Sequence, residues 1–238
     1  MRRRDFIKVI VGSAAAWQLA TIAQLDGAAM AAVAVTGPRA VLVYNSRGAC
    51  NGAVLAQDLV LTAAHCVVDR DKFQIVGFIG DTVYSLRDVA AAEPYPRSIG
   101  APVTIPDMAL LRLTKPLPMS FGPALLTTRP VAVGDRLEVV GRAPPGGRET
   151  STERAGRAVL AVASVDRYRL GLVGEVSRLG ACYGFSGAPV FAIRAGIPQL
   201  AAIVRGGDCD RYLAVVPITP FREWIDETAK RLGSSFAP

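Results

Sequence analysis

Short apolar runs recur along most of the chain and alternate with turn residues. Runs of this kind, bounded by Gly, Pro, Asn or Asp, predict β-strands. We expect strands at 40–44, 53–55, 59–62, 73–79, 108–113, 136–141, 158–165, 169–173, 188–193, 199–205 and 212–216. Many short strands separated by Gly and Pro are typical of an all-β barrel or sandwich. This number of strands suits two small barrels better than one.

Only the last segment has the spacing of a helix. Its apolar positions are Phe221, Trp224, Ile225, Thr228 and Leu232. Thr219 can cap the start, Pro220 fits the first turn and Gly233 fits the end. We therefore expect one C-terminal amphipathic α-helix that docks on the second barrel.

Prolines mark the joint between the two barrels. The stretch 114–130 holds Pro116, Pro118, Pro123 and Pro130. We expect a first barrel over 36–117 and a second barrel with the helix over 118–238.

The N-terminus has the layout of an export signal. Three arginines are followed by an uncharged stretch, 9–25, and then by small residues. The segment 3–8, RRDFIK, resembles a twin-arginine signal. We expect a signal peptide over 1–23, cleaved after Ala23 or as late as Ala34. An uncleaved anchor is the alternative, because the uncharged stretch lies at the lower length limit for spanning a bilayer. We expect no stable anchor, and export through the twin-arginine machinery to the periplasm or exterior of a bacterium.

Composition excludes several classes of protein. Hydrophobic residues at 51% and charged residues at 20% exclude a disordered chain. The net charge of +7 falls to about +4 without residues 1–23, which hold four basic residues and one acidic residue. No basic cluster is interleaved with aromatics, so we expect no nucleic-acid partner. A single His excludes the H-E-x-x-H type of zinc site. We expect no metal, no cofactor and a monomer.

Four cysteines fit an exported protein, because export permits disulfides. Cys50 and Cys66 are close in sequence, as are Cys182 and Cys209, and we predict these two pairs. Four cysteines allow three connectivities. The C-x₂₋₄-C spacing of a zinc site does not occur.

Three motifs carry candidate chemistry. His65 lies in TAAHC, where small neighbours leave its ring room to face a cleft. Asp107 begins the apolar run DMALLRL, and a buried carboxylate needs a partner such as a His nitrogen. Ser186 lies in GFSGAP, where glycines let N–H groups converge beside the hydroxyl, as an oxyanion requires. Taken singly, each motif also fits a structural histidine, a turn aspartate or a plain Gly-Ser turn.

Together the motifs resemble those of the trypsin/chymotrypsin-like serine peptidase family, in the family's order His, Asp, Ser. The resemblance extends over about 41–232. It implies two six-stranded antiparallel β-barrels packed together, with a C-terminal α-helix and the site in the crevice between them. His65 matches the general base, Asp107 the orienting acid and Ser186 the nucleophile. The N–H groups of Gly184 and Ser186 match the oxyanion hole.

The resemblance also implies the activity and its substrate. It indicates a secreted serine endopeptidase that hydrolyses polypeptides through an acyl-enzyme, with both predicted cysteine pairs matching family bridges. It places the substrate pocket at Gly180, Tyr183, Arg205, Gly206, Gly207 and Asp210. Asp210 would favour Arg or Lys before the scissile bond. Alternatively, Asp208 and Asp210 are turn residues at the surface.

Three positions depart from the family pattern. Phe185 replaces the Asp that pairs with a newly cut N-terminus, so we expect no N-terminal activation and an apolar contact that holds the loop instead. Ala188 replaces the usual second Gly, and Arg205 replaces the Ser that touches the Asp of the triad. These departures keep an alternative open, in which a weak or inactive trypsin-fold protein acts as a binding module.

Overall fold

The computed structural model describes residues 39–45, 48–67, 73–79, 82–98, 105–143, 154–179, 184–208 and 210–236. The predicted signal peptide at 1–23 lies outside these ranges, as do Gly180, Cys182, Tyr183 and Cys209. Within these ranges, no helix is both long enough and apolar enough to cross a bilayer.

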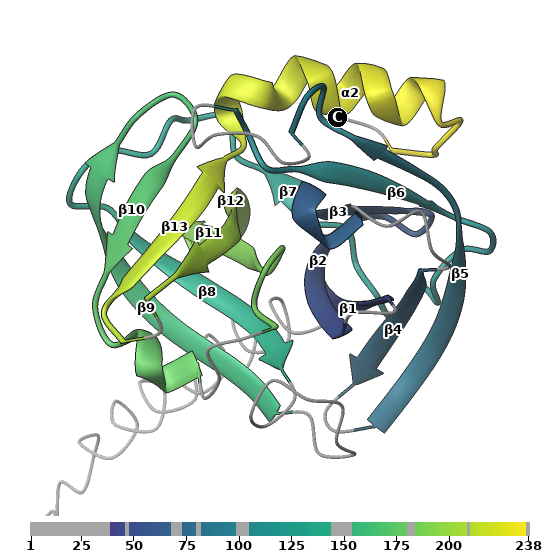
Figure 1. Ribbon diagram of the computed structural model, residues 1–238, viewed down its shortest axis with the longest axis horizontal. Coiled ribbons are helices and arrows are strands. Elements are labelled where there is room, and N and C mark those ends of the chain that lie inside the picture. The colour runs from purple at the N-terminus through teal and green to yellow at the C-terminus, as the bar shows by residue number, and fades with distance from the viewer. Residues whose placement is uncertain are drawn as a thin grey trace, which may run out of the picture.

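The first half of the described chain forms a closed antiparallel barrel in the order β1-β2-β3-β6-β5-β4 (Figure 1). Its strands are β1 (Ala40–Asn45), β2 (Gly48–Ala56), β3 (Leu59–Thr62), β4 (Gln74–Ile79), β5 (Thr82–Pro94) and β6 (Ala109–Leu113). Alternating side chains point inward, and Val41, Val43, Ile75 and Phe121 are buried in one cluster. This alternation is what the apolar pattern of the strands requires.

The second half forms a second ring of six strands, in the order β11-β8-β9-β10-β13-β12, closed by pairing of β11 with β12. Its strands are β8 (Arg136–Ala143), β9 (Arg154–Val165), β10 (Leu170–Val173), β11 (Pro189–Arg194), β12 (Ile197–Gly207) and β13 (Tyr212–Pro217). The short β7 (Leu125–Leu126) pairs in parallel with β12, outside the ring. Two six-stranded antiparallel barrels with a C-terminal helix confirm the predicted fold class.

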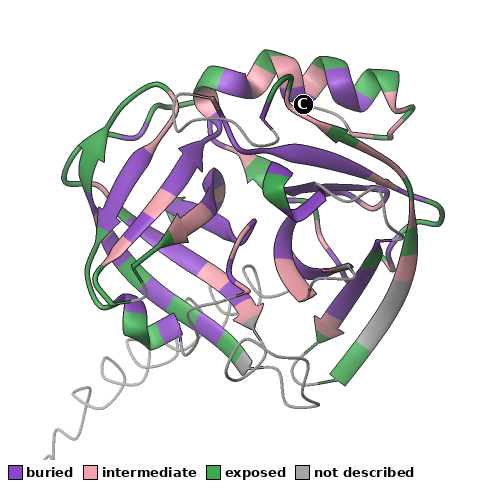
Figure 2. Ribbon diagram, in the orientation of Figure 1, coloured by how far each residue is buried: buried purple, intermediate pink, exposed green. Residues whose placement is uncertain are grey.

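A separate apolar cluster joins the two barrels. It combines Leu61 and Leu110 of the first barrel with Phe191 and Ile203 of the second. Figure 2 shows buried residues along the strands of both barrels. Burial of large apolar side chains contributes roughly 1.5–3 kcal/mol each. This interface fixes the two barrels relative to each other.

The sequence predicted that the C-terminal helix docks on the second barrel, but the helix lies against β6 of the first barrel, and its Ile225 and Ala229 join the apolar cluster between the barrels. The helix follows the 3₁₀ turn η5 (Thr219–Phe221) and runs over α2 (Arg222–Arg231). Tyr95 of the first barrel packs edge-on against Phe221 and Trp224, at centroid distances of 5.6 and 5.2 Å. The expectation that Thr219 caps the helix is wrong, because Phe221 is the N-cap and no side chain makes the capping bond. Gly233, with φ +66°, follows its end.

Candidate active site

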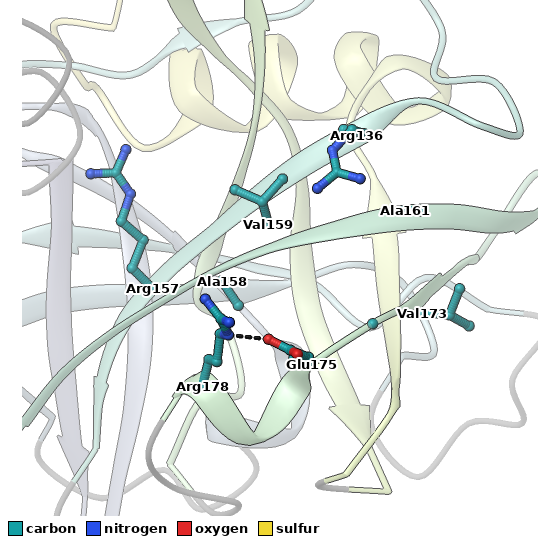
Figure 3. Close-up of a pocket in the computed structure, with 9 residues that line it drawn as sticks. Arg136, Arg157, Ala158, Val159, Ala161, Val173, Glu175 and Arg178 are labelled. Atoms are coloured by element: carbon teal, nitrogen blue, oxygen red, sulfur yellow. Dashed lines mark ion pairs between the residues drawn. The ribbon is translucent and has the colours of Figure 1, made fainter. Parts of the chain in front are cut away.

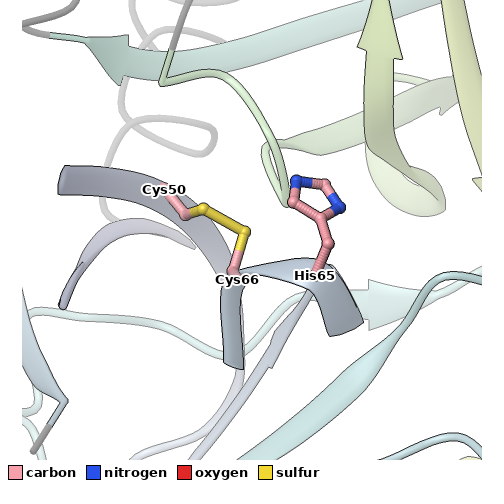
Figure 4. A group of neighbouring side chains, drawn as sticks. All are labelled: Cys50, His65 and Cys66. Carbon is pink, nitrogen blue, oxygen red and sulfur yellow. A yellow bond between two sulfur atoms is a disulfide. The ribbon is translucent and has the colours of Figure 1, made fainter. Parts of the chain in front are cut away.

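His65 lies on the 3₁₀ turn η2 (Ala64–Val67), directly after β3. Its side chain is 43% exposed, although Ala64, Cys66 and Val67 around it are buried. Cys66 is bonded to Cys50, which confirms this predicted pair. Figure 4 shows the His65 ring projecting from η2 beside the bridge. The disulfide therefore fastens the turn that carries the exposed imidazole to β2.

Asp107 holds His65 at two points. Its Oδ1 accepts the backbone N–H of His65 at 2.9 Å, and its Oδ2 lies 2.6 Å from His65 Nδ1. When Nδ1 donates this bond, Nε2 is left as the acceptor. Burial raises the pKa of Asp107, but the hydrogen bonds and charge of His65, together with the charge of Arg205, bring that pKa below its usual value. Asp107 is therefore favoured as a carboxylate.

The turn that carries Ser186 has glycines on both sides in the left-handed region. Gly184 has φ +99° and Gly187 has φ +78°. The Gly187 N–H donates to Val204 O of β12 at 2.7 Å, which ties the turn to the second barrel. The N–H groups of Gly184 and Ser186 donate no hydrogen bond within the described ranges. As far as the described residues go, this is compatible with the oxyanion hole that the resemblance implies.

The Ser186 turn packs against the segment that leads to His65. A Cβ placed on Gly187 would collide with Asn51 O and Thr62 Oγ1, and would lie 3.1 Å from Ala63 N. Only Ala64 separates Ala63 from His65 in sequence. The turn that carries Ser186 and the segment that precedes His65 are therefore in contact across the barrel interface. Among the described residues no hydrogen bond joins Ser186 Oγ to the His65 ring, and such bonds are often long before substrate binds.

Comparison with known proteins identifies the fold family. A family model described as Trypsin matches residues 28–225. The chain belongs to the trypsin family. It is also similar to trypsin epsilon of Drosophila erecta, with 26% identity over 213 residues that cover 77% of this chain and 78% of that protein. Membership indicates a serine-type peptidase at the level of the family, and polypeptides as its class of substrate.

Phe185, which departs from the trypsin-family pattern, is buried beside the turn with 3% exposure. Its ring occupies a hollow formed by two glycines that pair directly across β8 and β9, Gly141 and Gly156. A Cβ on Gly141 would lie 2.8 Å from Phe185 Cε1, and one on Gly156 would lie 2.6 Å from Phe185 Cζ. The apolar contact expected from the sequence is confirmed, and the paired glycines are what make room for it.

Asn51 belongs to the site, although the sequence did not single it out. It lies on β2 next to Cys50, and it is 1% exposed. Its side chain and backbone bond to both the Ser186 turn and the segment before His65. The one signal in the sequence was that Asn51 is a polar residue just before the apolar part of its strand.

Arg205, predicted in place of the family's Ser, lies on β12 beside Asp107. Its Nε is 3.6 Å from Asp107 Oδ2, the oxygen that faces His65 Nδ1. The guanidinium and the imidazole therefore share one carboxylate oxygen. Gly206 and Gly207 follow at the end of the same strand.

The two aspartates near the expected pocket wall have different environments. Asp208 Oδ1 accepts the N–H groups of Asp210, Arg211 and Tyr212, and these bonds lower the pKa of its exposed carboxyl. Asp208 is thus a turn residue. The Asp210 side chain is 76% exposed and lies 3.7 Å from Arg211 Nε. It borders an open hollow of about 580 Å³ with Gly174.

Another hollow, of about 560 Å³, lies on the outer face of the second barrel (Figure 3). It is bordered by Arg136, Arg157 and Arg178. Arg157 pairs with Glu138, and Arg178 pairs with Glu175. These ion pairs neutralise two of its three arginines. None of the residues around it comes from the segments that carry His65, Asp107 or Ser186.

A cluster of metal-ligating atoms also lies at His65. The Sγ atoms of Cys50 and Cys66 and a ring nitrogen of His65 lie within 4.8 Å of one another. The two sulfurs are bonded to each other, however, and thiolates are what bind metal ions. In this oxidised state the cluster offers one imidazole and no thiolate.

Proposed function

We propose that the protein is an exported serine endopeptidase with His65, Asp107 and Ser186 as its catalytic triad. The observation that carries the proposal is the pair of hydrogen bonds that Asp107 makes with His65, one to the backbone N–H at 2.9 Å and one to the ring at 2.6 Å. This arrangement fixes an exposed imidazole with one nitrogen free. The packing of the Ser186 turn against Thr62 and Ala63 supports it.

The proposed reaction is acyl transfer to Ser186. Ser186 Oγ adds to the carbonyl carbon of the scissile bond as His65 Nε2 accepts the hydroxyl proton. The N–H groups of Gly184 and Ser186 stabilise the oxyanion, and losing one such donor costs about 3–4 kcal/mol of barrier. His65 then gives the proton to the leaving amine, and the C–N bond breaks. Water, activated by the same imidazole, hydrolyses the acyl-enzyme.

The proposed activity does not depend on a cut at the N-terminus. Phe185 already fills the hollow between Gly141 and Gly156, whereas an Asp at this position would need a buried cation as partner. The Cys50–Cys66 disulfide is consistent with export. We further propose that residues 1–23 are a twin-arginine signal.

A second candidate function is that of a binding module with little or no activity. The contact of Arg205 with Asp107 favours it, because a guanidinium beside the carboxylate competes with the imidazolium that catalysis must form. The resemblance of all three motifs to the active family favours the enzyme.

Labelling with a fluorophosphonate probe separates the two functions. The enzyme requires a labelled wild type, and loss of labelling in both Ser186→Ala and His65→Ala. Ser164→Ala, which changes an exposed serine on β9, is the matched control and should label normally. A folded wild type that never labels would support the binding module. Intact mass of the secreted, unreduced protein tests the cleavage site and both disulfides in the same sample.

A further inference from the structure

The structure assigns to Asn51 the role of a positioning residue that fixes the Ser186 turn and joins it to the His65 segment. The inference rests on the proposed function. Asn51 uses every polar group that it has. Its backbone N–H donates to Ser186 O at 2.6 Å, and its backbone carbonyl accepts Thr62 Oγ1 at 2.6 Å.

The side-chain amide makes three further bonds. Nδ2 donates to Gly184 O at 2.6 Å and to Arg142 O at 2.7 Å, while Oδ1 accepts the Arg142 N–H at 2.9 Å. An amide has two donors and one carbonyl acceptor, so this pattern uses both its ends. A carboxylate of the same shape has no donor for the two carbonyls.

The positions of these carbonyls give the bonds their consequence. Gly184 O precedes Phe185, and Ser186 O follows it, so Asn51 holds the turn on both sides of the Phe185–Ser186 pair. The flanking residues, Gly184 and Gly187, are glycines, whose backbones are less restricted than those of other residues. Pinning the two carbonyls restricts that freedom and so helps to set the direction of the Ser186 N–H and the position from which its side chain projects. Preorganised donors are what an oxyanion hole requires.

The same residue spans the two barrels. Asn51 is on β2, Arg142 is on β8, and Thr62 ends β3 three residues before His65. A shift of the Ser186 turn is therefore transmitted to the first barrel at Thr62. Misplacement of a reacting group by about 1 Å can cost about 100-fold in rate.

Asn51→Asp is the sharpest variant, because it replaces only the donor nitrogen. We expect kcat against a peptide substrate to fall about 100-fold while KM changes less than about threefold, since the turn and not the substrate groove is altered. Because a buried carboxylate can unfold a protein, Asn51→Ser is measured beside it. Thr127→Val is the control, since Thr127 is also a buried polar residue, 1% exposed, and its side-chain hydroxyl bonds, among the described residues, only to the backbone of Arg129. A kcat in the Asn51 variants equal to that of the control would overturn the inference.

Hydrogen exchange gives a readout that needs no activity. In a Ser186→Ala background, the peptide covering 184–188 should exchange about tenfold faster in both Asn51 variants, with β13 unchanged. In the unaltered chain, the two Nδ2 protons of Asn51 should give separate, protected NMR signals. Unchanged exchange in the variants, or rapidly exchanging Nδ2 protons in the unaltered chain, would overturn the inference. Suppose that the wild type fails to label, yet its Nδ2 protons are protected and the Asn51 variants exchange faster. That result would refute the proposed function and leave the positioning role of Asn51 standing.

Discussion

Arg205 Nε lies 3.6 Å from Asp107 Oδ2, the oxygen that also lies 2.6 Å from His65 Nδ1. A positive charge at this distance stabilises the carboxylate and opposes the imidazolium that forms when His65 takes a proton. The Arg205 side chain is 24% exposed, so water weakens the effect without removing it. Arg205 therefore acts as a second positively charged partner of the carboxylate that bonds to His65.

Replacing Arg205 by Ser should raise activity. We expect kcat/KM above neutral pH to rise up to about fivefold, since a partly exposed ion pair contributes about 0.2–1 kcal/mol. Arg205→Lys keeps the charge and should stay close to the wild type. Loss of activity in a folded Arg205→Ser would mean that Arg205 positions Asp107.

Gly187→Ala and Gly196→Ala form a matched pair. Both glycines have nearly the same φ, +78° and +77°, but Gly196 has no atom within 4 Å of an added Cβ. Gly196→Ala should therefore cost only the left-handed penalty of about 1–2 kcal/mol. Gly187→Ala should cost more, because the Cβ meets Asn51 O and Thr62 Oγ1, and it should abolish fluorophosphonate labelling. Urea denaturation gives both costs, and equal costs would contradict the close packing of the turn.

Phe185→Ala should both destabilise the protein and loosen the nucleophile. Emptying the hollow between Gly141 and Gly156 should lower the free energy of unfolding by about 3–5 kcal/mol. Val159→Ala, at a side chain that is 49% exposed, should change it little. The second-order rate of labelling should fall in Phe185→Ala under conditions where it remains folded. Normal labelling there would mean that Phe185 serves stability alone.

A strand that was not predicted from the sequence lacks a clear apolar pattern of its own. No strand was expected over β5 (Thr82–Pro94), which mixes charged residues with a run of Ala. Its two neighbours, β4 and β6, supply the pairing. Tertiary context of this kind overrides local propensity. The strongly apolar β3 and β6, by contrast, were predicted almost to the residue.

The residues of the candidate site also differ in whether the local sequence marks them. His65, Asp107 and Ser186 could be predicted as candidates because each lies in a local motif. Asn51 was not found, because its side chain bonds to backbone groups 91 and 133 residues away, at Arg142 and Gly184. A backbone carbonyl is present at every position, so such a bond leaves no mark on the partner's residue type.

Asp58 should make stability depend on acid pH. It lies in the turn between β2 and β3, where it accepts Ser234 Oγ at 2.6 Å and Ser235 N–H at 3.1 Å and pairs with Arg112 at 3.1 Å. Burial raises the pKa of Asp58, but these bonds and the Arg112 charge bring it below its usual value. Because the folded pKa is below the unfolded one of about 3.9, the stabilisation is complete above that value and is lost as pH falls through the folded pKa.

Asp58→Asn should therefore lower the urea midpoint at pH 7, because hydrogen bonds to a charged group contribute about 1.5–3 kcal/mol. The gap between Asp58→Asn and the wild type should close towards pH 2, where both side chains are neutral. Asp88→Asn, at an exposed carboxyl, should show no such gap at pH 7. A gap of the same size at both pH values would show that Asp58 acts through its shape and not through its charge, and that the C-terminal segment is held by neutral bonds.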